Sequence, residues 1–219
     1  MTAPQGKRTK TESKKKLRIG LMGGTFNPIH YGHLLAAEQA RSKFRLAQVI
    51  FIPSSKPPHK RPGNIAGAEH RYLMTVLATS TNPYFSVSRV EIDRSGPSYA
   101  IDTIRHFVGQ YKNDNPEIYF ITGYDAVLEI LTWRSPEKIL KLCTIISASR
   151  PGYDISRIRR VLKPEQLKKI KILEAAALAI SSTDIRNRVA GGLPIKYLLP
   201  DSVEEYIYKK ELYVAKEKR

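Results

Sequence analysis

The stretch Gly23–His33 constrains the fold of this chain more than any other. An apolar segment typical of a strand, residues 17–22, precedes it, and residues 34–40 follow it with the composition of a helix. A glycine-rich turn between a strand and a helix lets backbone N–H groups approach a phosphate, and the helix N-terminus adds positive potential. His30 and His33, three residues apart at the helix start, would face one ligand. The stretch therefore predicts a binding site for a nucleotide triphosphate.

Two widespread nucleotide-binding patterns are absent from this stretch. It has neither the G-x-x-x-x-G-K-[ST] pattern of P-loop NTPases nor the G-x-G-x-x-G pattern of dehydrogenases. His30 and His33 have a spacing that could bind zinc, but no third ligand stands nearby, so no metal ligand is assigned. A purely structural turn is the other alternative.

Short apolar strands and helices alternate along the rest of the chain. Continuous apolar runs are typical of strands buried in a parallel sheet. The expected strands are residues 17–22, 48–53, 85–92, 117–121, 144–149 and 170–173. One expected helix ends near residue 44, and two span 68–79 and 99–111. Further helices are expected to begin near 125, 135, 164, 181 and 201, the last with a capping-box pattern. This alternation predicts an α/β fold, a doubly wound parallel sheet with helices on both faces, in one domain over residues 17–219.

The charge of the chain is strongly basic. The 219 residues carry a net charge of +17 with globular values of 42% apolar and 26% charged residues. Such a charge favours acidic partners: phosphorylated small molecules, nucleic acid or anionic surfaces. Residues 1–16 concentrate lysine and arginine and lack aliphatic side chains, so a disordered basic arm is expected there, or a leader without a specific role.

Cysteine usage and hydropathy bear on the compartment. The sole cysteine, Cys143, lies in the apolar stretch 142–146 and is expected to be a buried, inert thiol. One cysteine allows no internal disulfide and no cysteine-rich zinc site, which favours a cytoplasmic location. No apolar run approaches the roughly 20 residues of a membrane span, so no membrane partner is expected.

A second candidate phosphate site lies at residues 181–186. The hydroxyls of Ser182 and Thr183 at a helix start can donate to phosphate oxygens, and Arg186, one turn further on, adds a guanidinium. An ordinary serine N-cap beside a solvated arginine explains the same residues. Alone, this segment does not decide between the two interpretations.

The two candidate segments together resemble a known superfamily. Gly-Thr-Phe-x-Pro-x-His-x-Gly-His followed late in the chain by Ser-Ser-Thr-x-Ile-Arg is similar to the nucleotidyltransferases named for their HxGH motif. The motifs between them resemble those of bacterial nicotinate-nucleotide adenylyltransferases. These are residues 57–60, 91–99, 123–125 with Trp133, 150–153 and 197–200. The resemblance covers about residues 17–213 and implies a Rossmann-like nucleotidyltransferase fold. Pantetheine-phosphate adenylyltransferases have similar motifs at both ends of the chain, but they usually have threonine at the position of His30.

The resemblance implies adenylyl transfer from ATP to nicotinate mononucleotide, giving deamido-NAD and pyrophosphate in NAD biosynthesis. The acceptor's own 5′-phosphate attacks the α-phosphate, so catalysis is mostly positioning and stabilisation of charge. By this resemblance Mg²⁺ bridges the phosphates of ATP without dedicated protein ligands. The catalytic residues would be His30, His33 and Arg186. The ATP site would also include Gly23, Gly24, Thr25, Phe26, Ser182 and Thr183.

The acceptor side follows from the same resemblance. The mononucleotide site would comprise Asn27, Lys60, Tyr99, Ala100, Asp125 and Trp133. Lys60 would meet the phosphate or be a solvated loop lysine, Asp125 would take ribose hydroxyls, and Trp133 would stack on the pyridine ring or belong to the core. Tyr99 and Ala100 would lie by the nicotinate carboxylate.

Three residues depart from the pattern of many family members. Asn27 stands where many have aspartate, Tyr124 replaces a small residue beside the expected ribose site, and Ala100 stands where many have threonine. The loss of the threonine hydroxyl leaves open whether the acid or the amide mononucleotide is preferred. A related adenylyltransferase that uses nicotinamide mononucleotide is therefore the nearest alternative. A basic nucleic-acid-binding protein is an alternative of another class, although the chain has no RNA- or DNA-binding motif, and homo-oligomer formation is also open.

Overall fold

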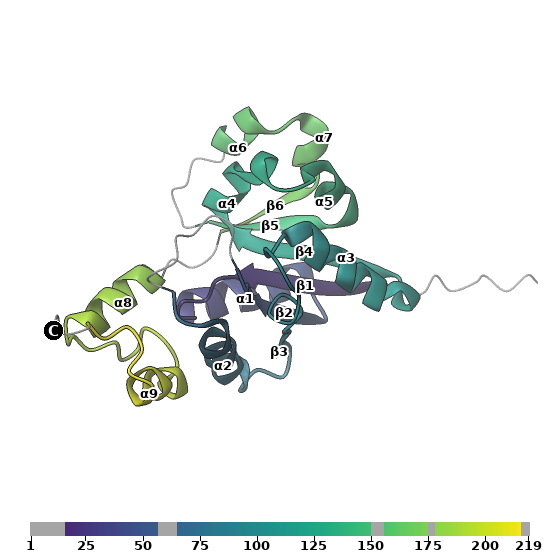
Figure 1. Cartoon of the computed structure of the whole chain (residues 1–219). Helices are drawn as coiled ribbons and strands as arrows, with labels where there is room; N and C mark the ends of the chain where they lie inside the picture. Colours follow the sequence, from purple (N-terminus) through teal and green to yellow (C-terminus); the bar gives the residue numbers. More distant parts are fainter. Residues whose placement is uncertain (1–15, 57–64, 150–155, 175–177, 216–219) are drawn as a thin grey trace, which may run out of the picture.

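The computed structural model describes residues 16–56, 65–149, 156–174 and 178–215. Its sheet has six parallel strands in the order β3-β2-β1-β4-β5-β6 (Figure 1). They are β1 (Leu17–Gly24), β2 (Gln48–Pro53), β3 (Phe85–Val87), β4 (Pro116–Gly123), β5 (Thr144–Ser149) and β6 (Ile170–Glu174). The order reverses between β1 and β4, which is where ligands bind in such sheets. The predicted doubly wound parallel sheet is confirmed.

Helices cover both faces of this sheet. They are α1 (Tyr31–Phe44), α2 (Ala68–Thr79), α3 (Ala100–Gln110), α4 (Tyr124–Leu128), α5 (Pro136–Leu142), α6 (Ser156–Val161), α7 (Pro164–Leu167), α8 (Ser182–Ala190) and α9 (Asp201–Lys209), with short 3₁₀ turns η1 (Lys112–Asp114) and η2 (Ile130–Thr132). Helices α1, α2, α8 and α9 supply one apolar core, and α3 to α6 supply the other. Strand β1 contributes Ile19 and Leu21 to the second core and Met22 to the first, as the alternation of side chains along a strand requires. No helix among the described residues is long and apolar enough to cross a membrane.

Several local expectations were wrong. The strand expected over residues 85–92 ends at Val87, because the chain turns where the N–H groups of Ile92 and Asp93 both donate to the carbonyl of Arg89. The helix expected from Pro164 is a single turn, α7. Helix α9 begins after Pro200 without a side-chain cap, so the capping box is absent.

One expectation on the core was right: the side chain of Cys143 is 3% exposed, and burial raises its pKa to about 12. A thiol with that pKa is almost entirely protonated near neutrality, as expected of an inert cysteine.

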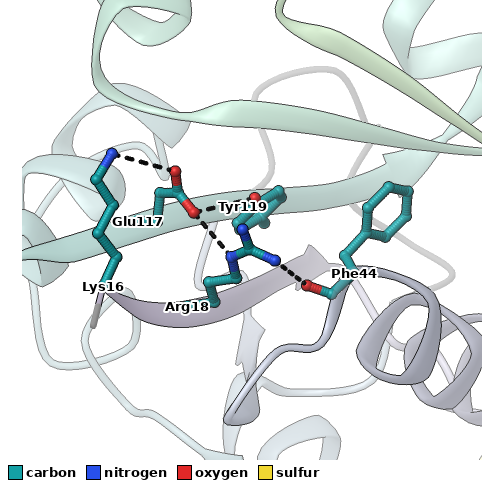
Figure 2. Close-up of polar contacts among 5 residues, drawn as sticks. All are labelled: Lys16, Arg18, Phe44, Glu117 and Tyr119. Carbon is teal, nitrogen blue, oxygen red and sulfur yellow. Dashed lines mark hydrogen bonds and ion pairs between the residues drawn. The ribbon is translucent and has the colours of Figure 1, made fainter.

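A polar cluster ties the N-terminal ends of β1 and β4 together (Figure 2). The Nε atom of Arg18 donates to Glu117 Oε2 over 2.9 Å, and its Nη1 donates to the carbonyl of Phe44 at the end of α1 over 3.3 Å. Lys16 Nζ lies 3.4 Å from Glu117 Oε1, and the Tyr119 hydroxyl also donates to this carboxylate. Burial opposes ionisation of Glu117, but Arg18 and Lys16 together hold its pKa below the ordinary value. The cluster fixes β1 against β4 at the end opposite Gly23 and Gly24.

Candidate active site

The end of β1 and the loop after it pack closely because the last two residues of the strand, Gly23 and Gly24, leave room for aromatic rings. A Cβ atom on Gly24 would lie 2.8 Å from the ring of Phe26, and one on Gly23 would lie 3.0 Å from Cζ of Phe120. The Phe26 side chain is 2% exposed, although its backbone has a positive φ of 47°. Its ring meets the His33 ring edge-on, with centroids 5.2 Å apart. The phenyl ring thus packs under the turn and supports one of the two histidines.

The two histidines lie side by side at the start of α1. His30 is the N-cap residue, and the ring centroids of His30 and His33 are 3.8 Å apart. The backbone N–H of His30 donates to Nδ1 of His33 over 3.3 Å, so the proton of a neutral His33 ring sits on Nε2. A Cβ atom on Gly32 would lie 3.0 Å from the His30 ring, so glycine permits this arrangement. Two imidazoles are therefore gathered at the positive end of a 14-residue helix.

Helix α8 begins against this loop and brings the second predicted phosphate segment to it. Ser182 Oγ donates to the carbonyl of Pro28, and Arg186 Nη1 donates to the carbonyl of Asn27, each over 2.8 Å. Arg186 Nη2 also donates to Thr183 Oγ1 over 3.2 Å. The helix is capped by Ser181, whose Oγ accepts the N–H of Asp184, and not by Ser182. Two segments far apart in the sequence thus form one surface. Ser182 and Arg186 anchor the loop; their contacts with phosphate stay predictions.

A cavity of about 550 Å³ opens beside the loop. Six residues predicted from the sequence line it: Gly23, Gly24, Thr25, Tyr99, Ala100 and Trp133. The volume is in the range of small-molecule sites. A larger and more open hollow of about 820 Å³, between Arg89 and His106 along α3, contains none of the predicted site residues. The smaller cavity is therefore the better candidate for a substrate site.

Asp125, a further predicted acceptor residue, is not among the residues that line the cavity. Asp125 is exposed in the first turn of α4, next to the cavity-lining Ala126. Lys60 lies outside the described residues. Tyr124 is 3% exposed and packs in the second core. Trp133 meets Phe120 edge-on with centroids 5.9 Å apart, so it combines packing against the core with a place on the cavity wall.

The chain matches a family model described as cytidylyltransferase-like over residues 21–188. It is 55% identical over 208 residues to a probable nicotinate-nucleotide adenylyltransferase of Thermoanaerobacter sp. (strain X514), an alignment that covers 91% of this chain and 96% of the relative. It is 54% identical over 199 residues to a probable nicotinate-nucleotide adenylyltransferase of Moorella thermoacetica, covering 90% and 91%. The chain belongs to the nicotinate-nucleotide adenylyltransferase family.

Solved structures agree with this family in their fold. A Plasmodium falciparum nicotinic acid mononucleotide adenylyltransferase complexed with NaAD superposes with a TM-score of 0.71 at 19% identity, covering 90% of this chain and 97% of that one. The same enzyme complexed with APC gives a TM-score of 0.69 at 18% identity over the same shares. At these identities the likeness shows the fold alone.

In this adenylyltransferase-family chain, Arg71 has a structural role: it holds the loop after β1, although the sequence did not reveal its partners. Its side chain is 1% exposed and donates to the carbonyls of Thr25, Ala66 and Ser55 over 2.8, 2.9 and 3.2 Å. Burial lowers the pKa of this guanidinium, with the Tyr213 side chain acting in the opposite direction. Arg71 therefore joins the loop after β1 to both ends of the connection between β2 and α2.

Asn27 is also held inside the protein. It is 4% exposed, and its Oδ1 accepts hydrogen bonds from the Ala66 N–H over 3.0 Å and from the Tyr213 hydroxyl over 2.9 Å. The side chain predicted to meet the mononucleotide thus fastens the loop to the C-terminal part of the chain. A contact between Asn27 and a mononucleotide stays a prediction.

Three charged residues on the cavity wall were not predicted as site residues: Glu91, Glu129 and Arg134. The Glu91 carboxylate is 7% exposed and accepts a hydrogen bond from Thr103 Oγ1 over 2.6 Å. Burial raises its pKa, and hydrogen bonds from Thr103 and Ser98 and the charge of Arg94 oppose that rise. Ser98 Oγ in turn accepts the N–H of Ser55, which links the start of α3 to the loop after β2. Among the described residues, no cluster of three or more histidine, cysteine, aspartate or glutamate side chains could hold a metal ion.

Proposed function

We propose that this protein transfers the adenylyl group of ATP to nicotinate mononucleotide, forming deamido-NAD and pyrophosphate. One observation carries the proposal: α8 is hydrogen-bonded to the loop that bears the histidines. Ser182 donates to the carbonyl of Pro28, and Arg186 donates to the carbonyl of Asn27. This junction gathers the donors that a triphosphate requires. The names of the relatives, at 54% and 55% identity, support the same reaction.

The proposed reaction is an in-line displacement at the α-phosphorus of ATP. An oxygen of the acceptor's 5′-phosphate forms the new P–O bond, the bond to the bridging oxygen breaks, and pyrophosphate leaves with the electron pair. The 5′-phosphate is already ionised near neutral pH, so the nucleophile needs no general base. The protein then contributes position and positive charge in the transition state.

Each part of the loop has a defined task in this reaction. Nε2–H of His33 and the N-terminus of α1 would stabilise charge on the α-phosphate, with His30 beside them. Arg186, whose Nη1 is fixed to the carbonyl of Asn27, would meet the departing pyrophosphate. Mg²⁺ would arrive with the triphosphate and neutralise part of its charge.

The acceptor would occupy the 550 Å³ cavity. Trp133 would stack on the pyridine ring, and the first backbone N–H groups of α3, at Tyr99 and Ala100, would face the ring substituent. Asp125 would bind ribose hydroxyls from the first turn of α4, and Lys60 would approach the 5′-phosphate.

A comparison of two acceptors tests the proposal. Pyrophosphate release is followed with ATP and either nicotinate or nicotinamide mononucleotide at equal concentrations. We expect a higher kcat/KM for the acid. Equal or faster turnover of the amide would contradict the assignment.

Two arginines of α8 provide a matched pair of variants for the catalytic site. Arg186 is bonded to the loop, whereas Arg188 pairs with Asp184 on the outside of the same helix. We expect Arg186→Gln to lower kcat/KM for ATP by about 10²–10³-fold, the range for loss of one donor to a transition-state charge. Arg188→Gln should stay near wild type. Full activity of Arg186→Gln would remove α8 from the catalytic site.

A further inference from the structure

The charges on the cavity wall are unfavourable for an acceptor that carries a carboxylate on its ring. Glu91 and Glu129 present acidic side chains, and Arg134 is the only lysine or arginine among the described residues that line the cavity. A carboxylate entering the cavity therefore needs a compensating donor nearby. Arg134 and the N-terminus of α3 are the groups placed to supply one.

Arg134 is an exposed residue on this wall. It follows η2 and Trp133 and comes directly before Ser135, the N-cap residue of α5, so the backbone on both sides belongs to ordered turns. Its Cζ atom lies 4.7 Å from the centroid of the Tyr99 ring. Stacking of this kind occupies the face of the guanidinium and leaves its N–H donors pointing outward in the plane.

Tyr99, whose ring this guanidinium contacts, comes directly before α3. Tyr99 is the N-cap residue of this 11-residue helix and gives the first turn no side-chain hydrogen bond. Ala100, the first helical residue, has no hydroxyl to offer. The start of α3 therefore has backbone N–H groups to offer a ligand, and Arg134 stands beside them.

We infer that Arg134 determines specificity for the acid form of the acceptor: its guanidinium, stacked on Tyr99, binds the ring carboxylate together with the N–H groups at the start of α3. This inference rests on the proposed function. The amide of nicotinamide mononucleotide lacks the charge that would make an arginine contact strong. Discrimination then comes from the Arg134 side chain in a site that has alanine at position 100.

Acceptor kinetics of Arg134→Gln test this role. We expect kcat/KM for nicotinate mononucleotide to fall about tenfold or more, mainly through KM, since a hydrogen bond to a charged group is lost. The value for nicotinamide mononucleotide should change less than about twofold, because the amide does not use the charge. Arg134→Lys should retain part of the preference. The control is Arg105→Gln, which removes an exposed arginine of α3 that lines the other hollow, and both acceptors should then behave as with wild type.

The ratio of the two kcat/KM values separates the outcomes. A merely structural role for Arg134 would lower both values together, and that result, or an unchanged ratio, would overturn the inference. If the wild-type protein forms deamido-NAD but the ratio does not move, the inference fails while the proposed function stands. If the wild-type protein adenylylates neither mononucleotide, both fail.

Discussion

Replacing Arg71 with methionine tests whether this side chain holds the loop after β1 in place. The guanidinium is 1% exposed and donates to three carbonyls, that of Thr25 in the loop after β1 and those of Ser55 and Ala66 in the connection between β2 and α2. Methionine has a similar reach and no donor, so all three acceptors lose their partner. Removing a hydrogen bond from a charged group costs about 1.5–3 kcal/mol, but the desolvated guanidinium also carries a penalty that the substitution relieves. We expect a net loss of about 3–5 kcal/mol in the free energy of unfolding, a large part of the ~5–15 kcal/mol typical of a domain.

Urea unfolding at neutral pH measures this loss, and kcat/KM for ATP measures its effect on the site. The control is Arg89→Met. The ion pairs of Arg89 with Glu69 and Asp93 lie at the surface, so this variant should unfold near the wild-type midpoint. Arg71→Lys keeps the charge but cannot span three separated carbonyls, so it should be intermediate. If Arg71→Met unfolds within about 1 kcal/mol of wild type and keeps its activity with ATP, Arg71 does not hold the loop, since lost hydrogen bonds to a charged group should cost more.

Three further predictions concern single positions. In Gly32→Ala the new Cβ would lie 3.0 Å from the His30 ring, so the imidazole must move; kcat should fall about tenfold in steady-state assays, and unchanged kcat would show that the placement of His30 is not critical. Burial raises the pKa of Glu91 above its ordinary value of 4.5, so the native state holds this proton more tightly than the unfolded chain. The contribution of Glu91 to stability is then complete below pH 4.5 and decreases as the pH rises through the raised pKa. In urea titrations the free energy of unfolding of wild type should therefore fall relative to that of Glu91→Gln over this pH rise, and a constant difference between the two would contradict the prediction. With its pKa near 12, Cys143 should not react with a thiol reagent in the native protein and should react once urea unfolds it; rapid native labelling, followed by absorbance, would show that the thiol is accessible.

The sheet could be predicted because its strands are buried on both faces. Strand β2 begins and ends where the apolar run 48–53 does, and β5 has its expected bounds, residues 144–149. A strand covered on two sides has no polar face, so the boundaries of the run mark the boundaries of the strand. The same reasoning failed for residues 85–92, where alternation continued past Val87 into a turn. Glu91 is buried there as part of a polar network and not as a member of a strand.

The candidate site could be predicted where it depends on contiguous motifs. The histidine pair and the start of α8 were both found, and the structure joins them through Ser182 and Arg186. Arg71 could not be found in this way, because its partners are backbone carbonyls, which any residue type provides. The only clue to Arg134 was its position beside Trp133; its place over Tyr99 depends on how α3 and α5 pack.

This protein joins two nucleotides through the α-phosphate of ATP. The most direct test is to incubate the protein with ATP, Mg²⁺ and nicotinate mononucleotide and to quantify every product by mass spectrometry and phosphate analysis. We expect equimolar deamido-NAD and pyrophosphate, with both products strongly reduced in His33→Ala. Release of ADP or AMP without a dinucleotide, or full product formation by His33→Ala, would contradict it.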